Sequence, residues 1–165
     1  MKWPLLIAGI LGLTLLQTSA VPAFQVLGVD SNLLLVVLCC WVIVRGTEEG
    51  MVLVPLAGLL VGLFSFEELA TSVAAFLPII VIAALRPHFS VHSTFGWTLA
   101  VVVAATLTHF IITALALELT GSSNNWISAI LDVLLPTVLV NFVLAIPLYW
   151  LIRWSLPRPR PLMGT

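Results

Sequence analysis

The chain has 165 residues, of which 61% are hydrophobic and 8% are charged, with a mean hydropathy of +1.22 and a formal net charge of −1. Soluble domains carry about 25% charged residues, so this composition excludes a protein that lies mainly in water. Six basic residues are also too few for the clustered cationic surface that nucleic-acid binding requires.

Six apolar runs predict an all-α, polytopic membrane protein with one integral membrane domain. A spanning helix needs about 20 apolar residues, so six spans leave no room for a soluble domain. We expect the spans at about residues 4–20, 29–45, 51–66, 69–85, 95–119 and 130–153, followed by a short cytoplasmic tail at 155–165. Only Phe66, Glu67 and Glu68 separate the third and fourth runs, so a single re-entrant hairpin is the alternative to two full spans there.

The first run resembles a secretory signal peptide. Lys2 precedes it, and Thr18, Ser19 and Ala20 imitate a small-residue cleavage site. We expect the run to be retained as the first span.

The basic residues predict the orientation. With six spans and a cytoplasmic amino terminus, every basic residue falls on the cytoplasmic side, namely Lys2, Arg45, Arg86, Arg153, Arg158 and Arg160. The outer loops then contain no Lys or Arg, as the positive-inside rule requires. Both termini are therefore expected in the cytoplasm.

Two pairs of residues stand out in the second and third runs. Cys39 and Cys40 are adjacent, and thiols in apolar surroundings behave as small, inert hydrophobic groups. Gly58 and Gly62 form a GxxxG pair, which lets a neighbouring backbone approach closely. The glycine pair is a candidate for helix packing within the chain or for a partner interface.

The fifth run carries a polar stripe. Thr106, His109 and Thr113 are spaced at i, i+3 and i+7 and lie on one helix face, which we expect to face protein. His109 is a candidate for a proton relay or a ligand, and the alternative is a histidine packed against its neighbours. The roles of His109, and of Asp132 in the last run, stay open.

No catalytic, cofactor or metal site is expected. His88 and His92 have HxxxH spacing, but no Cys or carboxylate lies nearby to complete a four-ligand site. Glu48 and Glu49 resemble the paired glutamates of intramembrane CAAX-type proteases, yet no arginine follows at the required offset. A rhomboid-like serine motif, a Gly-rich phosphate loop and an HExxH motif are absent from the sequence.

The last run contains two prolines and an asparagine. Pro136 and Pro147 are eleven residues apart, about three helical turns, so both kinks are expected to point to about the same side. A small or polar face is formed at four-residue steps by Thr137, Asn141, Ala145 and Tyr149. Near the middle of the membrane, Asn141 is expected to bond either to another span or to a carbonyl of its own helix.

The last run, LPTVLVNFVLAIPLYWLIR, resembles the carboxy-terminal signature of the rod shape-determining protein MreD family. In that signature a Pro, an Asn and a second Pro precede an aromatic and a basic residue, and the matching positions are Pro136, Asn141, Pro147, Tyr149 and Arg153.

Two earlier stretches are also similar to the family. In the family, the second span has an acidic residue, then a leucine run and then a cytoplasmic Arg-Gly pair. The second run is similar to this pattern, with Asp30 as the acidic residue and Arg45 and Gly46 as the pair. The third run, with its glycine pair, resembles the glycine-rich span that follows. Many members carry an aspartate near the end of that span, where this chain has Ser65 and Phe66.

The resemblance implies a six-helix bundle similar to the S-components of energy-coupling transporters, located as a multi-pass protein in the bacterial cytoplasmic (inner) membrane. It further implies a non-catalytic scaffold of the cell elongation (rod) complex, which controls cell shape and lateral peptidoglycan synthesis. The implied partners are MreC, through its transmembrane helix and adjoining region, and a complex with MreB, RodA and a penicillin-binding protein. A homodimer stays open.

The alternative function is an S-component-like subunit that binds a small molecule for uptake. The discriminating feature would be a polar pocket open to the outside. The only obviously polar cluster in the outer loops is SSNN, between Gly121 and Trp126.

Overall fold

The computed structural model describes residues 3–19, 32–65, 68–89, 93–121 and 126–155. Every regular element in these ranges is helical, which confirms the all-α prediction. The elements are α1 (Trp3–Ser19), α2 (Leu33–Arg45), α3 (Thr47–Ser65), α4 (Leu69–Phe76), α5 (Pro78–Ala84), the 3-10 turn η2 (Arg86–His88), α6 (Thr94–Leu119), α7 (Trp126–Ser128), the π-helical turn η3 (Ala129–Leu134) and α8 (Leu135–Ser155). The predictions that involve Lys2, Ala20, Asp30, Phe66, Glu67, His92, the SSNN cluster, Arg158 and Arg160 lie outside the described residues.

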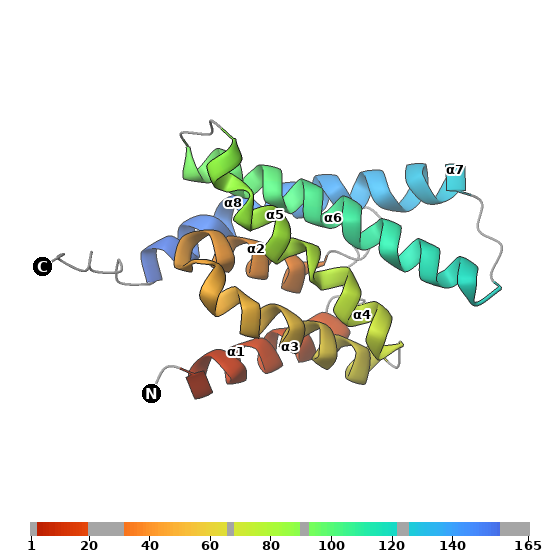
Figure 1. The fold of residues 1–165 in the computed structure, drawn as a ribbon, viewed down its shortest axis with the longest axis horizontal. Helices are drawn as coiled ribbons and strands as arrows, with labels where there is room; N and C mark the ends of the chain where they lie inside the picture. The colour runs from red at the N-terminus through yellow and green to blue at the C-terminus, as the bar shows by residue number, and fades with distance from the viewer. Residues whose placement is uncertain (1–2, 20–31, 66–67, 90–92, 122–125, 156–165) are drawn as a thin grey trace, which may run out of the picture.

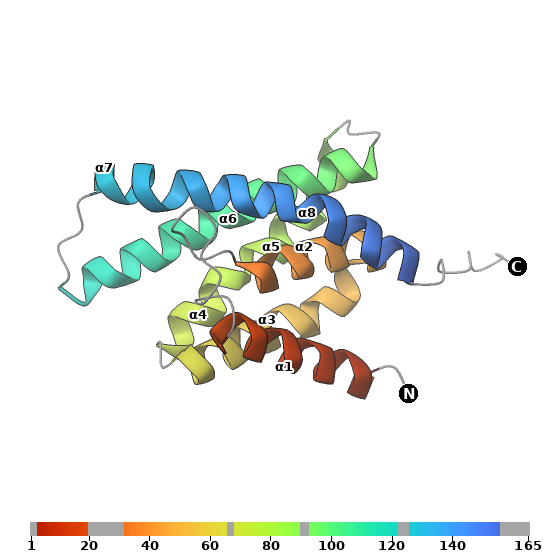
Figure 2. The same cartoon turned by 180° about the vertical axis from the view of Figure 1, so that it is seen from behind.

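The helices form a bundle of three layers (Figure 1). Helices α6 and α8 run side by side along one side, α1 and α3 lie along the opposite side, and α2 lies between the two pairs. The view from behind has the same arrangement (Figure 2). In both views α1 begins and α8 ends at one end of the bundle, while α7 lies at the other end.

Three helices of the described ranges are long and apolar enough to cross a membrane. They are α3, α6 and the continuous 30-residue helix Trp126–Ser155, which joins α7, η3 and α8. The remaining apolar helices, Leu6–Ser19, Leu33–Arg45 and Leu69–Ala84, are shorter. In length and composition the helices are therefore those of a membrane protein.

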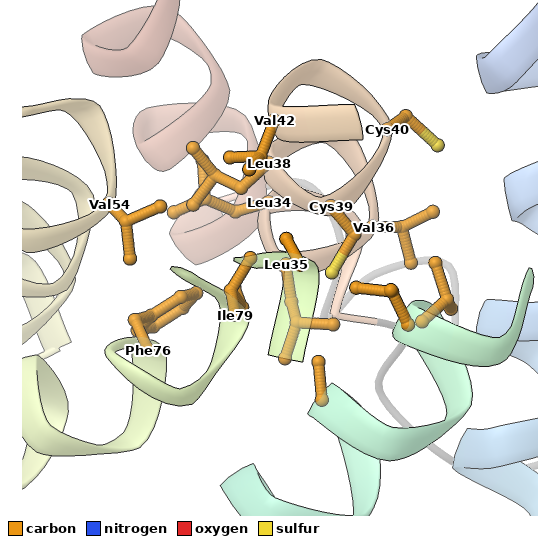
Figure 3. Close-up of a cluster of buried hydrophobic side chains, with 14 of the residues drawn as sticks. Leu34, Leu35, Val36, Leu38, Cys39, Cys40, Val42, Val54, Phe76 and Ile79 are labelled. Carbon is orange, nitrogen blue, oxygen red and sulfur yellow. The ribbon is translucent and has the colours of Figure 1, made fainter. Parts of the chain in front are cut away.

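Helix α2 is the centre of the core. Its 13 residues are apolar all round except for Arg45 at the end, a pattern typical of a helix buried on every side. Leu34, Val36 and Cys39 are fully buried, and α2 packs against α1, α3, α5, α6 and α8. Figure 3 shows its side chains meeting Phe76 and Ile79 on one side and Val54 on another. At about 20 Å, α2 is shorter than the hydrocarbon layer of about 30 Å, and other helices cover it.

Several boundaries differ from the predicted spans. Helix α2 begins at Leu33 after its cap Asn32, not at residue 29, and the last helix covers Trp126–Ser155 instead of 130–153. The fourth run is divided at Leu77 into α4 and α5, because Pro78 has no N–H to make the next helical hydrogen bond. Helix α3 begins at Thr47, earlier than the expected residue 51. Glu48 and Glu49 occupy its first turn, where carboxylates interact favourably with the helix dipole.

Candidate functional site

A polar cluster joins α2, α6 and α8 inside the bundle. It consists of Asn32, Thr106, His109 and Asn141. Asn141 is fully buried and lies about half-way along the helix Trp126–Ser155. Its Oδ1 accepts a hydrogen bond from the backbone N–H of Asn32 at 3.1 Å, and its Nδ2 donates to Thr106 Oγ1 at 3.1 Å. Of the two expected alternatives, the structure therefore contains bonds to other helices and not to a carbonyl of the same helix.

Asn32 caps the start of α2 within the cluster. Its Oδ1 accepts from the backbone N–H of Leu35 at 3.1 Å, and its Nδ2 lies 3.4 Å from Nε2 of His109. A side-chain cap of this kind satisfies one of the N–H groups that a helix leaves unbonded at its start. Because the N–H of Asn32 itself bonds to Asn141, α2 begins near the middle of the long helix that carries Asn141.

The polar stripe of α6 contributes two members of the cluster. Thr106 donates to the carbonyl of Val102 at 2.8 Å, and Thr113 donates to the carbonyl of His109 at 3.0 Å. Both hydroxyl protons therefore stay on their own helix, a common arrangement for threonine. The oxygen of Thr106 keeps a lone pair that accepts from Asn141.

His109 is half-buried between two neighbours. Its ring meets Phe76 edge to face, with the centroids 5.1 Å apart, and its Nε2 faces the amide of Asn32. The amide donates to Nε2 in the tautomer with the proton on Nδ1. Both contacts are those of a packed histidine. Within the described ranges no group of three or more His, Cys, Asp or Glu is arranged to hold a metal ion.

The glycine pair brings α3 against α4. A Cβ built on Gly58 would lie 2.8 Å from Val73 Cα, and one built on Gly62 would lie 3.1 Å from Leu69 Cα. The contacts are with backbone atoms, so a larger residue at either position must displace α4. Gly58 and Gly62 thus serve packing within the chain, and α4 occupies the face they present.

The two prolines of the last helix have different surroundings. Pro136 is half-buried and follows η3 directly, where the N–H of Leu135 bonds to the carbonyl of Ile130. Because Pro136 has no N–H, the ordinary helical bond to the carbonyl of Asp132 cannot form, and the wider π turn occurs in the residues just before it. Pro147 lies inside α8 on its exposed side.

The face of α8 that carries Asn141 packs against α2. Ala145 and Tyr149 are buried, and the thiol of Cys40 lies 3.9 Å from the carbonyl of Ala145. The hydroxyl of Tyr149 accepts from Nη1 of Arg153 at 3.2 Å. Thr137, the first residue of the predicted face, is only half-buried and bonds to Val133 of its own helix.

A second group of charged and aromatic side chains lies where α2 meets α3. Arg45 and Glu49 form an ion pair at 3.2 Å, and Trp41 Nε1 donates to the same carboxylate at 3.1 Å. The guanidinium of Arg45 also lies 5.8 Å from the ring centroid of Trp41. Glu49 thus links the end of α2 to the start of α3.

Cavities between the described helices include the following pair. One of about 250 Å³ is an apolar groove bounded by α1, α2, α3 and α8, and its lining includes Gly9, Leu13, Leu38 and Trp41. The other, of about 240 Å³, lies between α4 and α6 at the end where α6 finishes. It is lined by Glu68, Thr71, Thr113, Ala116, Leu117 and Thr120.

Sequence reasoning missed Asn32. Its signal was present, because Ser31 and Asn32 immediately precede the leucine run and such residues typically begin a helix. An apolar run marks the extent of a hydrophobic segment but not the residue at which its helix is capped.

Comparisons of the chain with protein-family models, with curated proteins and with solved structures gave no match.

Proposed function

We propose that this protein is a non-catalytic membrane scaffold of the bacterial elongation complex, of the MreD type. In this proposal the chain crosses the cytoplasmic membrane six times, and both termini are cytoplasmic. It binds MreC and helps to link MreB filaments to RodA and a penicillin-binding protein, and so contributes to cell shape and lateral peptidoglycan synthesis.

One observation carries the proposal. The stretches that resemble the family are far apart in sequence, yet Asn141 of the last stretch bonds to the residue that caps the second. Tyr149 and Arg153 of the same signature bond to each other. Isolated residues in an apolar run match a pattern easily, whereas a contact between two of the matching stretches supports a shared architecture.

The exposed surface supports recognition by helix faces. Apolar side chains are exposed along α3, including Met51, Leu59 and Leu63. The groove beside α1 is apolar and open at Gly9, where a Cβ would meet nothing within 4 Å. A small residue such as Gly9 at the edge of an apolar groove lets the side chains of a neighbouring spanning helix approach closely.

Copurification with MreC tests the proposal. The wild-type chain should retain MreC in mild detergent, and Gly9→Leu should weaken retention because its side chain enters the groove. Gly12→Leu is the matched control, since Gly12 also has nothing within 4 Å of its Cβ position but does not line the groove. Absence of MreC from the wild-type preparation would overturn the scaffold proposal. Equal loss of MreC from both variants would show that the groove is not the binding site for MreC.

A second function is favoured by the cavity between α4 and α6. Its lining combines the carboxylate of Glu68 with hydroxyls of Thr71, Thr113 and Thr120, and in the predicted orientation it opens outward. The rest of its lining is mostly apolar, and a mostly apolar cavity with a few polar groups is the usual form of a small-molecule site, which an S-component-like uptake subunit would need. Copurification of ATPase subunits and a bound vitamin, in place of MreC, would select this function.

A further inference from the structure

The cavity between α4 and α6 is built from one face of each helix. On α6 its lining residues follow one another at i, i+3, i+4 and i+7, which places them on one side of the helix; they are Thr113, Ala116, Leu117 and Thr120. Glu68 and Thr71, at the start of α4, form the other wall. At about 240 Å³ the cavity is smaller than sites for drug-sized ligands, which measure about 300–1,000 Å³, so its occupant must be compact.

The three hydroxyl groups of the lining have all committed their protons within the chain. Thr71 Oγ1 donates to Glu68 Oε2 at 3.1 Å, and Thr113 Oγ1 donates to the carbonyl of His109 at 3.0 Å. Thr120 Oγ1 donates to the carbonyl of Leu117 at 2.8 Å. A hydroxyl has one proton and two lone pairs, so towards the cavity these oxygens can only accept.

The carboxylate of Glu68 adds a negative charge and two further acceptor atoms. Its Oε1 has no partner among the described residues, since the bond from Thr71 goes to Oε2. The sequence has no Lys or Arg between Arg45 and Arg86 or between Arg86 and Arg153, so neither α4 nor α6 carries a cation. The polar side chains of the cavity therefore offer acceptors and a negative charge, and no donor.

The helix ends at the cavity favour the same sign of ligand charge. Helix α6 ends at Leu119, beside the cavity, and the last carbonyl groups of a helix carry partial negative charge. Helix α4 begins at the cavity with the opposite polarity, but its N-cap residue is Glu68 itself. An anion at the start of α4 would thus meet a carboxylate, whereas a cation meets no like charge.

We propose that this cavity binds a compact molecule with a primary ammonium group, such as an alkylamine or arylalkylamine. An ammonium group has three N–H donors and no acceptor, which is the complement of this lining. Glu68 pairs with its charge, Thr71 and Thr113 accept its N–H groups, and Ala116 and Leu117 contact its apolar body. The proposal deepens the second function above by naming the class of ligand, and it rests on that function only for uptake.

Isothermal titration calorimetry tests the selectivity for a cation. Purified full-length protein in lipid-free, neutral detergent is titrated with phenethylamine, with the neutral analogue 2-phenylethanol and with the anion 3-phenylpropanoate, and titrations of empty micelles are subtracted. Phenethylamine should bind about 5- to 30-fold more tightly than the alcohol, between the ratios for an exposed ion pair and for a hydrogen bond to a charged group. The anion should show no saturable binding. Equal affinity for the amine and the alcohol would overturn the proposal.

Variants identify the carboxylate responsible. Glu68→Gln removes the charge but keeps an oxygen that accepts from Thr71, so its affinity for phenethylamine should fall to that for the alcohol. Glu118→Gln is the matched control, because Glu118 lies at the same end of α6, does not line the cavity and accepts from Trp126 Nε1. An unchanged amine preference in Glu68→Gln, or an equal loss in Glu118→Gln, would refute the role of Glu68. Copurification of MreC with both variants tests the scaffold function separately.

Lipids distinguish the two sources of a primary ammonium group. In nanodiscs, phosphatidylethanolamine has N–H donors in its headgroup, whereas the quaternary ammonium of phosphatidylcholine has none. Competition with phenethylamine by the first lipid alone would assign the site to a lipid headgroup and exclude uptake of a soluble amine. Competition by neither lipid would assign it to a soluble amine. Equal competition by both would contradict the proposal, because the choline group cannot donate to the acceptors of the cavity.

Discussion

Replacement of Asn141 by Leu should destabilise the bundle strongly, because it leaves two polar groups without a partner. The backbone N–H of Asn32 loses its acceptor and the oxygen of Thr106 loses its donor. A buried N–H without a partner costs about 1–3 kcal/mol, and a lost hydrogen bond between spanning helices costs about 0.6 kcal/mol. The position is fully buried, so the larger Leu adds steric crowding. The expected total is about 2–4 kcal/mol.

Thermal unfolding in detergent measures this loss. For a chain of this size about 1 kcal/mol corresponds to 2–4 °C in Tm, so Asn141→Leu should lower Tm by roughly 5–15 °C. Val143→Leu is the matched control on the same helix, since Val143 is 62% exposed and should change Tm little. Thr106→Val completes a double-mutant cycle, in which contacting residues couple by about 0.5–3 kcal/mol. A Tm within about 2 °C of wild type for Asn141→Leu would refute the interhelical role of the amide.

Three further predictions concern packing, thiol access and topology. Gly58→Ala should lower the free energy of unfolding in detergent by about 1–3 kcal/mol, because its Cβ would lie 2.8 Å from a backbone atom of α4. Gly9→Ala is the control, since its Cβ would have free space and the change should be neutral or stabilising. Equal effects of the two substitutions would contradict the contact between Gly58 and α4. Cys39 and Cys40 are buried and free, so a maleimide should label them only after unfolding, and rapid labelling of the folded protein would contradict their burial. Reporter fusions at both termini should report the cytoplasm, and a periplasmic carboxy terminus would favour an odd number of spans.

Hydropathy predicted the bounds of α6 closely. Helix α6 covers Thr94–Leu119 against an expected 95–119, because the run is uninterrupted and has a Ser93 cap whose side chain accepts from the N–H of Gly96. Hydropathy alone could not predict that the fourth run forms two helices, α4 and α5, because one proline hardly changes the mean hydropathy of an apolar segment. The division follows from the missing N–H of Pro78, which hydropathy does not register.

The polar cluster was predictable only in part. A buried amide in an apolar helix requires partners, so the sequence indicates that Asn141 bonds within the bundle. Its partners, Thr106 and Asn32, are 35 and 109 positions away in the sequence. Which residues meet Asn141 therefore depends on how the helices are arranged in space, and no local sequence pattern specifies this arrangement. The π turn before Pro136 had a local cause, but a proline does not by itself distinguish a π turn from a kink.

The bond between Asn32 and Asn141 has a consequence for biosynthesis. The two residues are 109 positions apart. At about 5–20 residues synthesised per second, Asn141 is added roughly 5–20 s after Asn32, so the N–H of Asn32 lacks this acceptor during that time. During that interval α2, too short to cross the bilayer alone, also lacks the covering provided by α6 and α8. Release of the nascent chain before residue 141 therefore leaves the N–H of Asn32 without its acceptor and α2 without part of its cover. The carboxy-terminal helix thus completes the assembly of the helix at the other end of the sequence.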